Sequence, residues 1–240
     1  LKDNHHLNKE KIDIDFATLM KNDEHIKIIF LIFYSSIIYH IAQFMRFNKM
    51  VIPKNILFSG TASKSINILD PEQEKISQMF NEIYNEVYKK EDAKIEIKID
   101  NDPKIITAKG ALKANTDNKI EELIQSYIGL SPEKEILSGL TYSKIDFTII
   151  DQVIENLTEY FNLLDGMNTK LNFNKSFGIS NASYETFKNM RMENCKDYLL
   201  REIEDRKIDV SDVNGNLEET LFFYPLKGLL NELATKVSDL

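Results

Sequence analysis

The chain has 240 residues, 42% of them hydrophobic, which is enough for one large core or two smaller ones without disulfide bonds or structural metal ions. Its formal net charge of −8 argues against a protein that binds nucleic acids through general contacts with phosphates. Cys195 is the only cysteine, so no disulfide bond can form within the chain, and the four histidines show no metal-binding spacing with it. We therefore predict no metal site and no nucleic-acid partner.

The start of the chain is polar, with a short amphipathic patch that ends at Leu19. It shows no basic segment followed by an apolar core and a cleavage site, so no signal peptide is expected. The first residue is Leu1 instead of methionine. We expect a piece of a longer cytoplasmic protein, in which the missing part could hold half of an active site.

An uncharged apolar segment, 28–45, follows between Lys27 and Arg46. Its 18 residues reach the lower limit for a membrane span, but they include tyrosines, serines, a histidine and a glutamine. These polar groups favour a core helix of a soluble protein over a span. We predict a helix over 22–48, with His40 as a hydrogen-bonded core or boundary residue. The helix ends before Pro53, because the residue that precedes a proline resists the helical conformation.

The segment from Asn55 to Asp70 is the most informative part of the chain. An apolar run over 56–58 predicts a buried central strand, and a short helix is predicted over 62–69. The turn between them consists of small residues, which let a backbone approach a ligand, and N–H groups at a helix start favour anionic or polar ligands. The candidate ligand-binding residues are Ser59, Gly60, Thr61, Ser63 and Lys64. The alternative is that this turn is only a tight connection.

Two further patterns complete an α/β unit. Asp70-Pro71 predicts the N-cap and first position of a helix whose apolar residues recur every three or four positions up to Val87. Residues 93–100 alternate between isoleucine and charged side chains, which predicts a half-buried strand near a sheet edge. After a turn, 105–112 leads into a small-residue helix start at Gly110. The order of these elements predicts strands joined by helical crossover connections.

The remainder of the chain is predicted to be mainly helical. We expect helices over 117–128, 147–164, 182–206 and 217–237, and a short strand over 140–145. Asp165-Gly166 is predicted to end the second of these helices, before a polar loop over 167–180. Pro225 is predicted to kink or restart the last helix. The chain is thus divided into an α/β part, 1–115, and a mainly helical appendage, 116–240.

The two glycine turns together resemble the C-terminal half of the actin–Hsp70–sugar kinase superfamily. The sequence ILFSGTASKSINIL is similar to the adenosine motif of that superfamily, and AKGAL over 108–112 resembles the later motif that starts the helix at the hinge between the two lobes. More narrowly, the chain looks like a bacterial actin/Hsp70-like protein. The resemblance covers about 22–114. It implies a partial ribonuclease-H-like lobe, with Gly110 in a structural role at the hinge.

The resemblance implies that the chain binds ATP or ADP with Mg²⁺ through Ser59, Gly60, Thr61, Ser63 and Lys64. The first turn has one glycine where relatives have two or three, and the phosphate loop of the other lobe is not in the chain. A phosphoryl-transfer site needs metal, phosphate cradle and water orientation together. We therefore expect a nucleotide-binding part that does not hydrolyse ATP alone and has no catalytic residue here, while the whole protein could be an ATPase. The alternative is a non-enzymatic module with a degenerate ATPase-like fold, whose helical half binds a protein partner.

The sequence contains other groups of polar and aromatic residues, but none of them predicts a catalytic or metal-binding site. The adjacent pairs Glu121-Glu122 and Glu218-Glu219 point in different directions on a helix, which does not suit paired acid and base catalysis. Residues 209–219 differ from a calcium loop, because glycine stands at the seventh place instead of the sixth. No histidine follows Cys195, so we expect an inert, partly buried thiol. The aromatic residues over 222–224 are expected to pack in a helical core, with a partner groove as the alternative.

Overall fold

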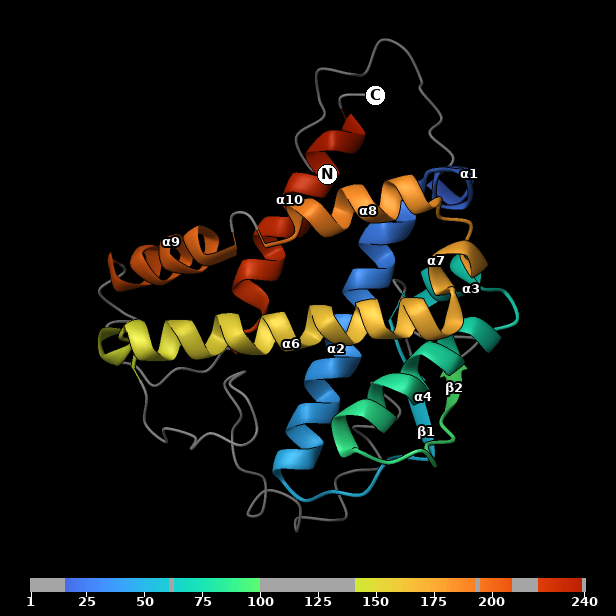
Figure 1. The fold of residues 1–240 in the computed structure, drawn as a ribbon, viewed down its shortest axis with the longest axis horizontal. Coiled ribbons are helices and arrows are strands. Elements are labelled where there is room, and N and C mark those ends of the chain that lie inside the picture. Colours follow the sequence, from blue (N-terminus) through green and yellow to red (C-terminus); the bar gives the residue numbers. More distant parts are fainter. Residues whose placement is uncertain (1–15, 61–62, 100–140, 193–194, 209–219, 239–240) are drawn as a thin grey trace.

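The computed structural model describes residues 16–60, 63–99, 141–192, 195–208 and 220–238. These residues are mostly helical and contain one small parallel sheet. The elements are α1 (Phe16–Asn22), α2 (Glu24–Phe47), β1 (Asn55–Phe58), α3 (Lys64–Leu69), α4 (Glu74–Tyr88), β2 (Glu96–Ile99), the 3-10 turn η3 (Tyr142–Lys144), α6 (Phe147–Leu171), α7 (Phe173–Ser176), α8 (Asn181–Met190), α9 (Cys195–Ile208) and α10 (Phe223–Ser238). Figure 1 shows α2 running through the middle of the molecule, with α6 crossing it.

Helix α2 is the central core element, and it confirms the predicted helix over 22–48. The carboxylate of Asp23 accepts a hydrogen bond from Ile26 N at 2.9 Å, which satisfies one free amide of the first turn. Of the helices in the described segments, only α2 is long and apolar enough to cross a membrane by length and composition. The other elements bury 56% of its most apolar window inside the protein. In this fold α2 is therefore a core helix.

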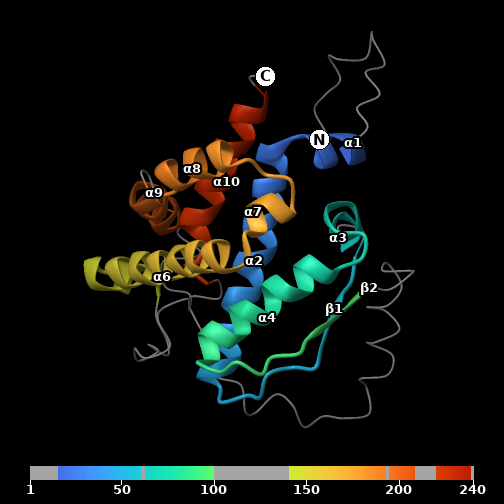
Figure 2. The same ribbon diagram turned by 45° about the vertical axis from the view of Figure 1, so that its right-hand side comes forward.

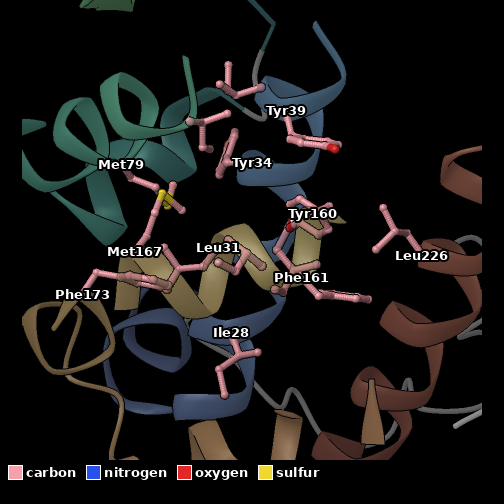
Figure 3. Packing of buried hydrophobic residues seen from close by; sticks show 14 of the residues in the cluster. Ile28, Leu31, Tyr34, Tyr39, Met79, Tyr160, Phe161, Met167, Phe173 and Leu226 are labelled. Atoms are coloured by element: carbon pink, nitrogen blue, oxygen red, sulfur yellow. Dashed lines mark hydrogen bonds between the residues drawn. The ribbon is translucent and has the colours of Figure 1, made fainter. Parts of the chain in front are cut away.

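The polar side chains of α2 form hydrogen bonds with α6. The hydroxyl oxygens of Ser35 and Tyr160 lie 2.7 Å apart, and both side chains are fully buried. Tyr39 donates a hydrogen bond of 2.8 Å to Asn156 Oδ1, also in the core. Figure 3 shows Tyr39 and Tyr160 among the apolar side chains between these helices. Because buried polar groups need partners, these bonds fix how α6 crosses α2.

Strands β1 and β2 form the sheet, which is parallel and pairs Asn55 with Glu96 at one end and Phe58 with Ile99 at the other. Helices α3 and α4 connect the two strands, so the predicted crossover unit is confirmed at this level. The alternation predicted for β2 is also confirmed. The prediction of a buried central strand is wrong. Leu57 is 53% exposed, because in the described residues helices cover one face of β1 only, where the ring of Phe58 lies 5.9 Å from that of Phe80.

Helix α4 begins at Glu74, three residues later than predicted. Pro71 lies in a turn, and Gln73 adopts a left-handed conformation with φ of 59°. Asp70 nevertheless serves the helix start, because its carboxylate accepts a hydrogen bond of 3.0 Å from Ile76 N. The predicted apolar face of α4 is confirmed by six buried side chains: Ile76, Met79, Phe80, Ile83, Tyr84 and Val87.

Helix α6 differs most from its prediction, because it continues through Asp165-Gly166 to Leu171. The carboxylate of Asp165 does not cap the backbone. It accepts hydrogen bonds from both terminal nitrogens of Arg191, at 2.8 and 2.6 Å. The predicted polar loop over 167–180 is therefore wrong, since it contains the end of α6 and all of α7. The sequence around Asp165 resembles that of an aspartate at a helix end. Its contact with Arg191 is visible only in the tertiary structure.

The other helical predictions are partly correct. The strand predicted over 140–145 is wrong where the structure describes it, because Tyr142–Lys144 is a 3-10 turn. The helix predicted over 182–206 is two helices, α8 and α9. Ser180 caps α8 by accepting a hydrogen bond of 3.2 Å from Ser183 N. Pro225 lies in the first turn of α10, where a missing amide is tolerated.

One hydrophobic cluster joins the two predicted parts of the chain. It contains Ile38 and Phe80 from the first part and Tyr160, Phe161 and Phe222 from the second. Figure 2 shows α2 between α4 on one side and the C-terminal helices on the other. The predicted boundary at 115 lies outside the described residues, as do the helix start predicted at Gly110 and the helix predicted over 117–128. The division into two domains therefore stays a prediction, while the described portions of both parts share a core.

Candidate functional site

The glycine turn after β1 is the site that the sequence predicted. Gly60 has φ of 82°, a left-handed conformation that favours glycine, and an added Cβ atom would meet no atom of the described residues within 4 Å. The space in front of Gly60 is therefore open. Ser59 and Lys64 are exposed, whereas Thr61 lies outside the described residues.

Ser63 forms its hydrogen bonds within this turn. It is buried, its hydroxyl donates a hydrogen bond of 2.7 Å to the carbonyl of Gly60, and its amide donates to the same oxygen at 3.2 Å. Both donors are thus used within the turn. Helix α3, which starts at Lys64, has only 6 residues. The second motif, over 108–112 with Gly110, lies outside the described residues, so its expected approach to Gly60 remains a prediction.

A polar cleft of about 540 Å³ lies where α2, α4 and α6 meet. This volume is within the range of small-molecule sites. Glu82 lines it and forms an ion pair of 2.7 Å with Lys170. Gly166 lies in the wall contributed by α6, and an added Cβ atom there would meet nothing within 4 Å. This glycine in the middle of α6 leaves the cleft open at its side.

Gln43 lines the same cleft and is 4% exposed. Its Nε2 donates a hydrogen bond of 2.7 Å to the hydroxyl of Tyr39. Its Oε1 has no hydrogen-bond partner among the described residues. The cleft therefore offers one buried acceptor to a polar molecule.

A second hollow, of about 500 Å³, lies beside the loops that lead into β1 and β2. Its lining contains four lysines and one aspartate, together with Tyr88 and the apolar residues 50–53. The hydroxyl of Tyr88, at the end of α4, donates a hydrogen bond of 2.9 Å to the carbonyl of Met50, which joins the end of α4 to the loop before β1. The charged side chains that line the hollow are therefore mostly positive.

An apolar groove of about 420 Å³ lies between α2 and α10. Phe33 and Ile37 line it from α2, and Leu226 and Leu230 from α10. Phe33 is 42% exposed. Lys227 is the one charged residue of the lining, and it forms an ion pair of 2.9 Å with Glu202. Sequence periodicity could not find this groove, because it arises where two helices far apart in the chain meet.

Burial shifts the pKa values of two titratable side chains in the described part of the core, Cys195 and His40. Burial raises the pKa of the Cys195 thiol to about 12, and the thiol donates to the carbonyl of Arg191. The expectation of an inert thiol agrees with this environment. Burial lowers the pKa of His40 to about 4, and its ring stacks on Phe222 at 5.6 Å. Within the described segments, no three His, Cys, Asp or Glu side chains gather to hold a metal ion.

Comparison with protein-family models, curated proteins and solved structures gives no match for this chain, so its functional assignment rests on the geometry of its own residues.

Proposed function

We propose that this chain is a protein-interaction module that binds an amphipathic helix of a partner protein in the groove between α2 and α10. The observation that carries the proposal is the apolar lining of this groove, with Phe33 42% exposed at its edge. Phe33, Ile37 and Ile41 recur every four residues on α2, and Ile41 is 38% exposed. Contiguous exposed apolar surface of this kind marks interaction sites.

The shape and charge of the groove favour a helix as its occupant. Two helices that enclose an apolar groove accept the apolar face of a third, whose anchors follow a three- and four-residue spacing. Lys227 is 61% exposed at the side of the groove, so an acidic residue beside the anchors of the partner would be favoured there. A second copy of this chain is disfavoured by the net charge of −8 that each copy carries.

A displayed library of helical peptides tests this proposal. We expect selected binders to share apolar residues at three- and four-residue spacing and to lose at least about tenfold in affinity against Ile37→Asp, because a charge would enter an apolar contact. Phe147→Asp is the matched control, since Phe147 is 71% exposed and lies outside the groove. The absence of binders, or binders that tolerate Ile37→Asp as well as the control, would contradict the proposal. Circular dichroism verifies that both variants fold.

Nucleotide binding at the glycine turn is the second candidate, and it keeps the proposed relation to the actin/Hsp70-like ATPases. The observation that favours it is the open space in front of Gly60, at the carboxyl end of β1. Ligands of parallel α/β sheets bind at the carboxyl ends of the strands. It ranks second because Ser63 uses both of its donors within the turn.

A thermal-stability assay with Mg-ATP and Mg-ADP tests the second candidate. Nucleotide at a hundred times its Kd should stabilise the fold by about 2.7 kcal/mol. Gly60→Val should abolish this shift, because the φ of 82° is unfavourable for a branched side chain and its methyl groups would occupy the open space. An equal shift for both proteins would place the nucleotide elsewhere. We expect no ATP turnover by the chain alone.

A further inference from the structure

The hollow of about 500 Å³ beside the loops before β1 and β2 is called the lysine hollow below. It gathers positive charge in a chain whose net charge is −8. Its four lysines come from two loops: Lys49 and Lys54 lie before β1, and Lys90 and Lys94 lie before β2. Asp92 is the one carboxylate in the lining. The four ammonium groups make the local charge opposite in sign to that of the whole protein.

The described part of the fold places no carboxylate in an ion pair with the lysines of the hollow. Within the described residues, none of the four forms an ion pair with a carboxylate within 4.0 Å. All four side chains are exposed around the hollow. Like charges that face one concave surface repel each other, and a multiply charged anion removes that repulsion.

Helix ends explain only half of this cluster. Lys49 and Lys90 follow the last turns of α2 and α4, where a positive charge is favourable to the helix dipole. Lys54 and Lys94 lie outside the helices. Lys54 directly precedes β1 and Lys94 comes two residues before β2, and the parallel pairing of Asn55 with Glu96 brings those strand starts together. The sheet register therefore brings the two segments that carry Lys54 and Lys94 side by side.

The wall of the hollow is half apolar. Tyr88 and Ile52 are partly buried in it, and Met50 and Val51 are exposed at its edge, Val51 by 83%. A ligand of this surface would carry several negative charges beside an apolar or ring portion. Phosphate groups meet the first requirement, because lysine ammonium groups bind them as point charges.

We propose that this hollow binds a phosphate-bearing anion, with Lys54 and Lys94 as its main charge contacts. The site lies at the amino ends of β1 and β2, whereas the glycine turn lies at the carboxyl end of β1. It is also separate from the groove between α2 and α10, since the two share no lining residue. The inference therefore stands independently of both candidate functions above.

The test is a binding titration with two kinds of phosphate. One arm uses tripolyphosphate in solution, and the other uses phosphatidylcholine vesicles with and without phosphatidic acid. We expect binding in at least one arm, weakened by added salt, and reduced by at least about tenfold in Lys54→Gln/Lys94→Gln. The arm that binds identifies the source of the phosphate. Because neither lysine is in a helix or an ion pair, the double variant should fold.

Lys21→Gln/Lys175→Gln is the matched control, since it removes two exposed lysines that lie outside the hollow. It should change the affinity by less than about twofold. Gly60→Val should also leave tripolyphosphate binding unchanged, which separates this site from nucleotide binding at the glycine turn. No binding in either arm, or an equal loss in both double variants, would overturn the proposal, because binding would then be absent or would reflect net charge alone.

Discussion

The contact between Asp165 and Arg191 gives the sharpest test of the fold. Asp165 lies in α6 and Arg191 immediately follows α8, and the guanidinium forms two hydrogen bonds with the carboxylate. The side chain of Arg191 is only 8% exposed and lies over the rings of Phe161 and Phe187, at 4.9 and 5.9 Å. Asp165→Asn removes the countercharge and leaves this buried cation in place.

The magnitude follows from the burial of the two partners. Loss of one partner from a fully buried ion pair costs about 3–5 kcal/mol. The side chain of Asp165 is 23% exposed, so water can reach the guanidinium in the variant. We therefore expect Asp165→Asn to lower the free energy of unfolding by about 2–3 kcal/mol. Arg191→Met removes the charge but keeps the apolar contacts, so in the double variant the two losses should not add.

Urea unfolding followed by circular dichroism measures these changes. Asp151→Asn is the matched control on the same helix: Asp151 pairs with Lys196 at 2.7 Å, but their side chains are 64% and 50% exposed. The control should cost less than about 0.5 kcal/mol, because exposed ion pairs contribute little. If Asp165→Asn were no more harmful than Asp151→Asn, or if the double variant showed additive losses, the reasoning about the buried contact would be refuted.

Three further predictions concern single residues. The pKa of His40 is lowered to about 4 by burial, so the unfolded chain binds a proton more readily as the pH falls from about 6.5 to about 4. Stability should therefore decline over this window by about 2–3 kcal/mol more in the wild type than in His40→Phe, and parallel pH curves would contradict this assignment. Gly166→Ala should raise the free energy of unfolding by about 0.5–1 kcal/mol, because alanine has the higher helix propensity and the new methyl group meets no atom of the described residues within 4 Å. A destabilised variant would contradict the presence of free space beside Gly166. Cys195 is 1% exposed, so it should react with iodoacetamide only in denaturant, and rapid labelling of the native protein would contradict its burial.

Local chemistry in the sequence was sufficient for the elements with strong periodicity. Helix α2 follows from its apolar run, and β2 follows from its alternation of isoleucine with charged residues. The left-handed conformation at Gly60 also agrees with the small-residue turn that the sequence predicted. These features depend on neighbours within a few residues, and such neighbours are visible in the chain itself.

The places where prediction failed depend on contacts across the chain. Asp165-Gly166 has the composition of a helix end, but α6 continues to Leu171, and the carboxylate of Asp165 binds Arg191, which lies beyond α8. Leu57 lies in an apolar run, but it is exposed because the described helices pack against the other face of β1. Both outcomes depend on which elements meet in space, and no local pattern encodes that.

The candidate sites also differ in whether one segment of the sequence is enough to reveal them. The sequence determined the glycine turn and the apolar character of α2, since each is written in one continuous segment. Only the tertiary structure shows that Phe33 and Leu226 line one groove, and that Lys54 and Lys94 line one hollow. Grooves and charged hollows form between segments that are distant in the chain, and their position depends on helix packing and strand register. For this reason the apolar groove and the hollow lined by lysines became visible only once the helices and strands were placed together.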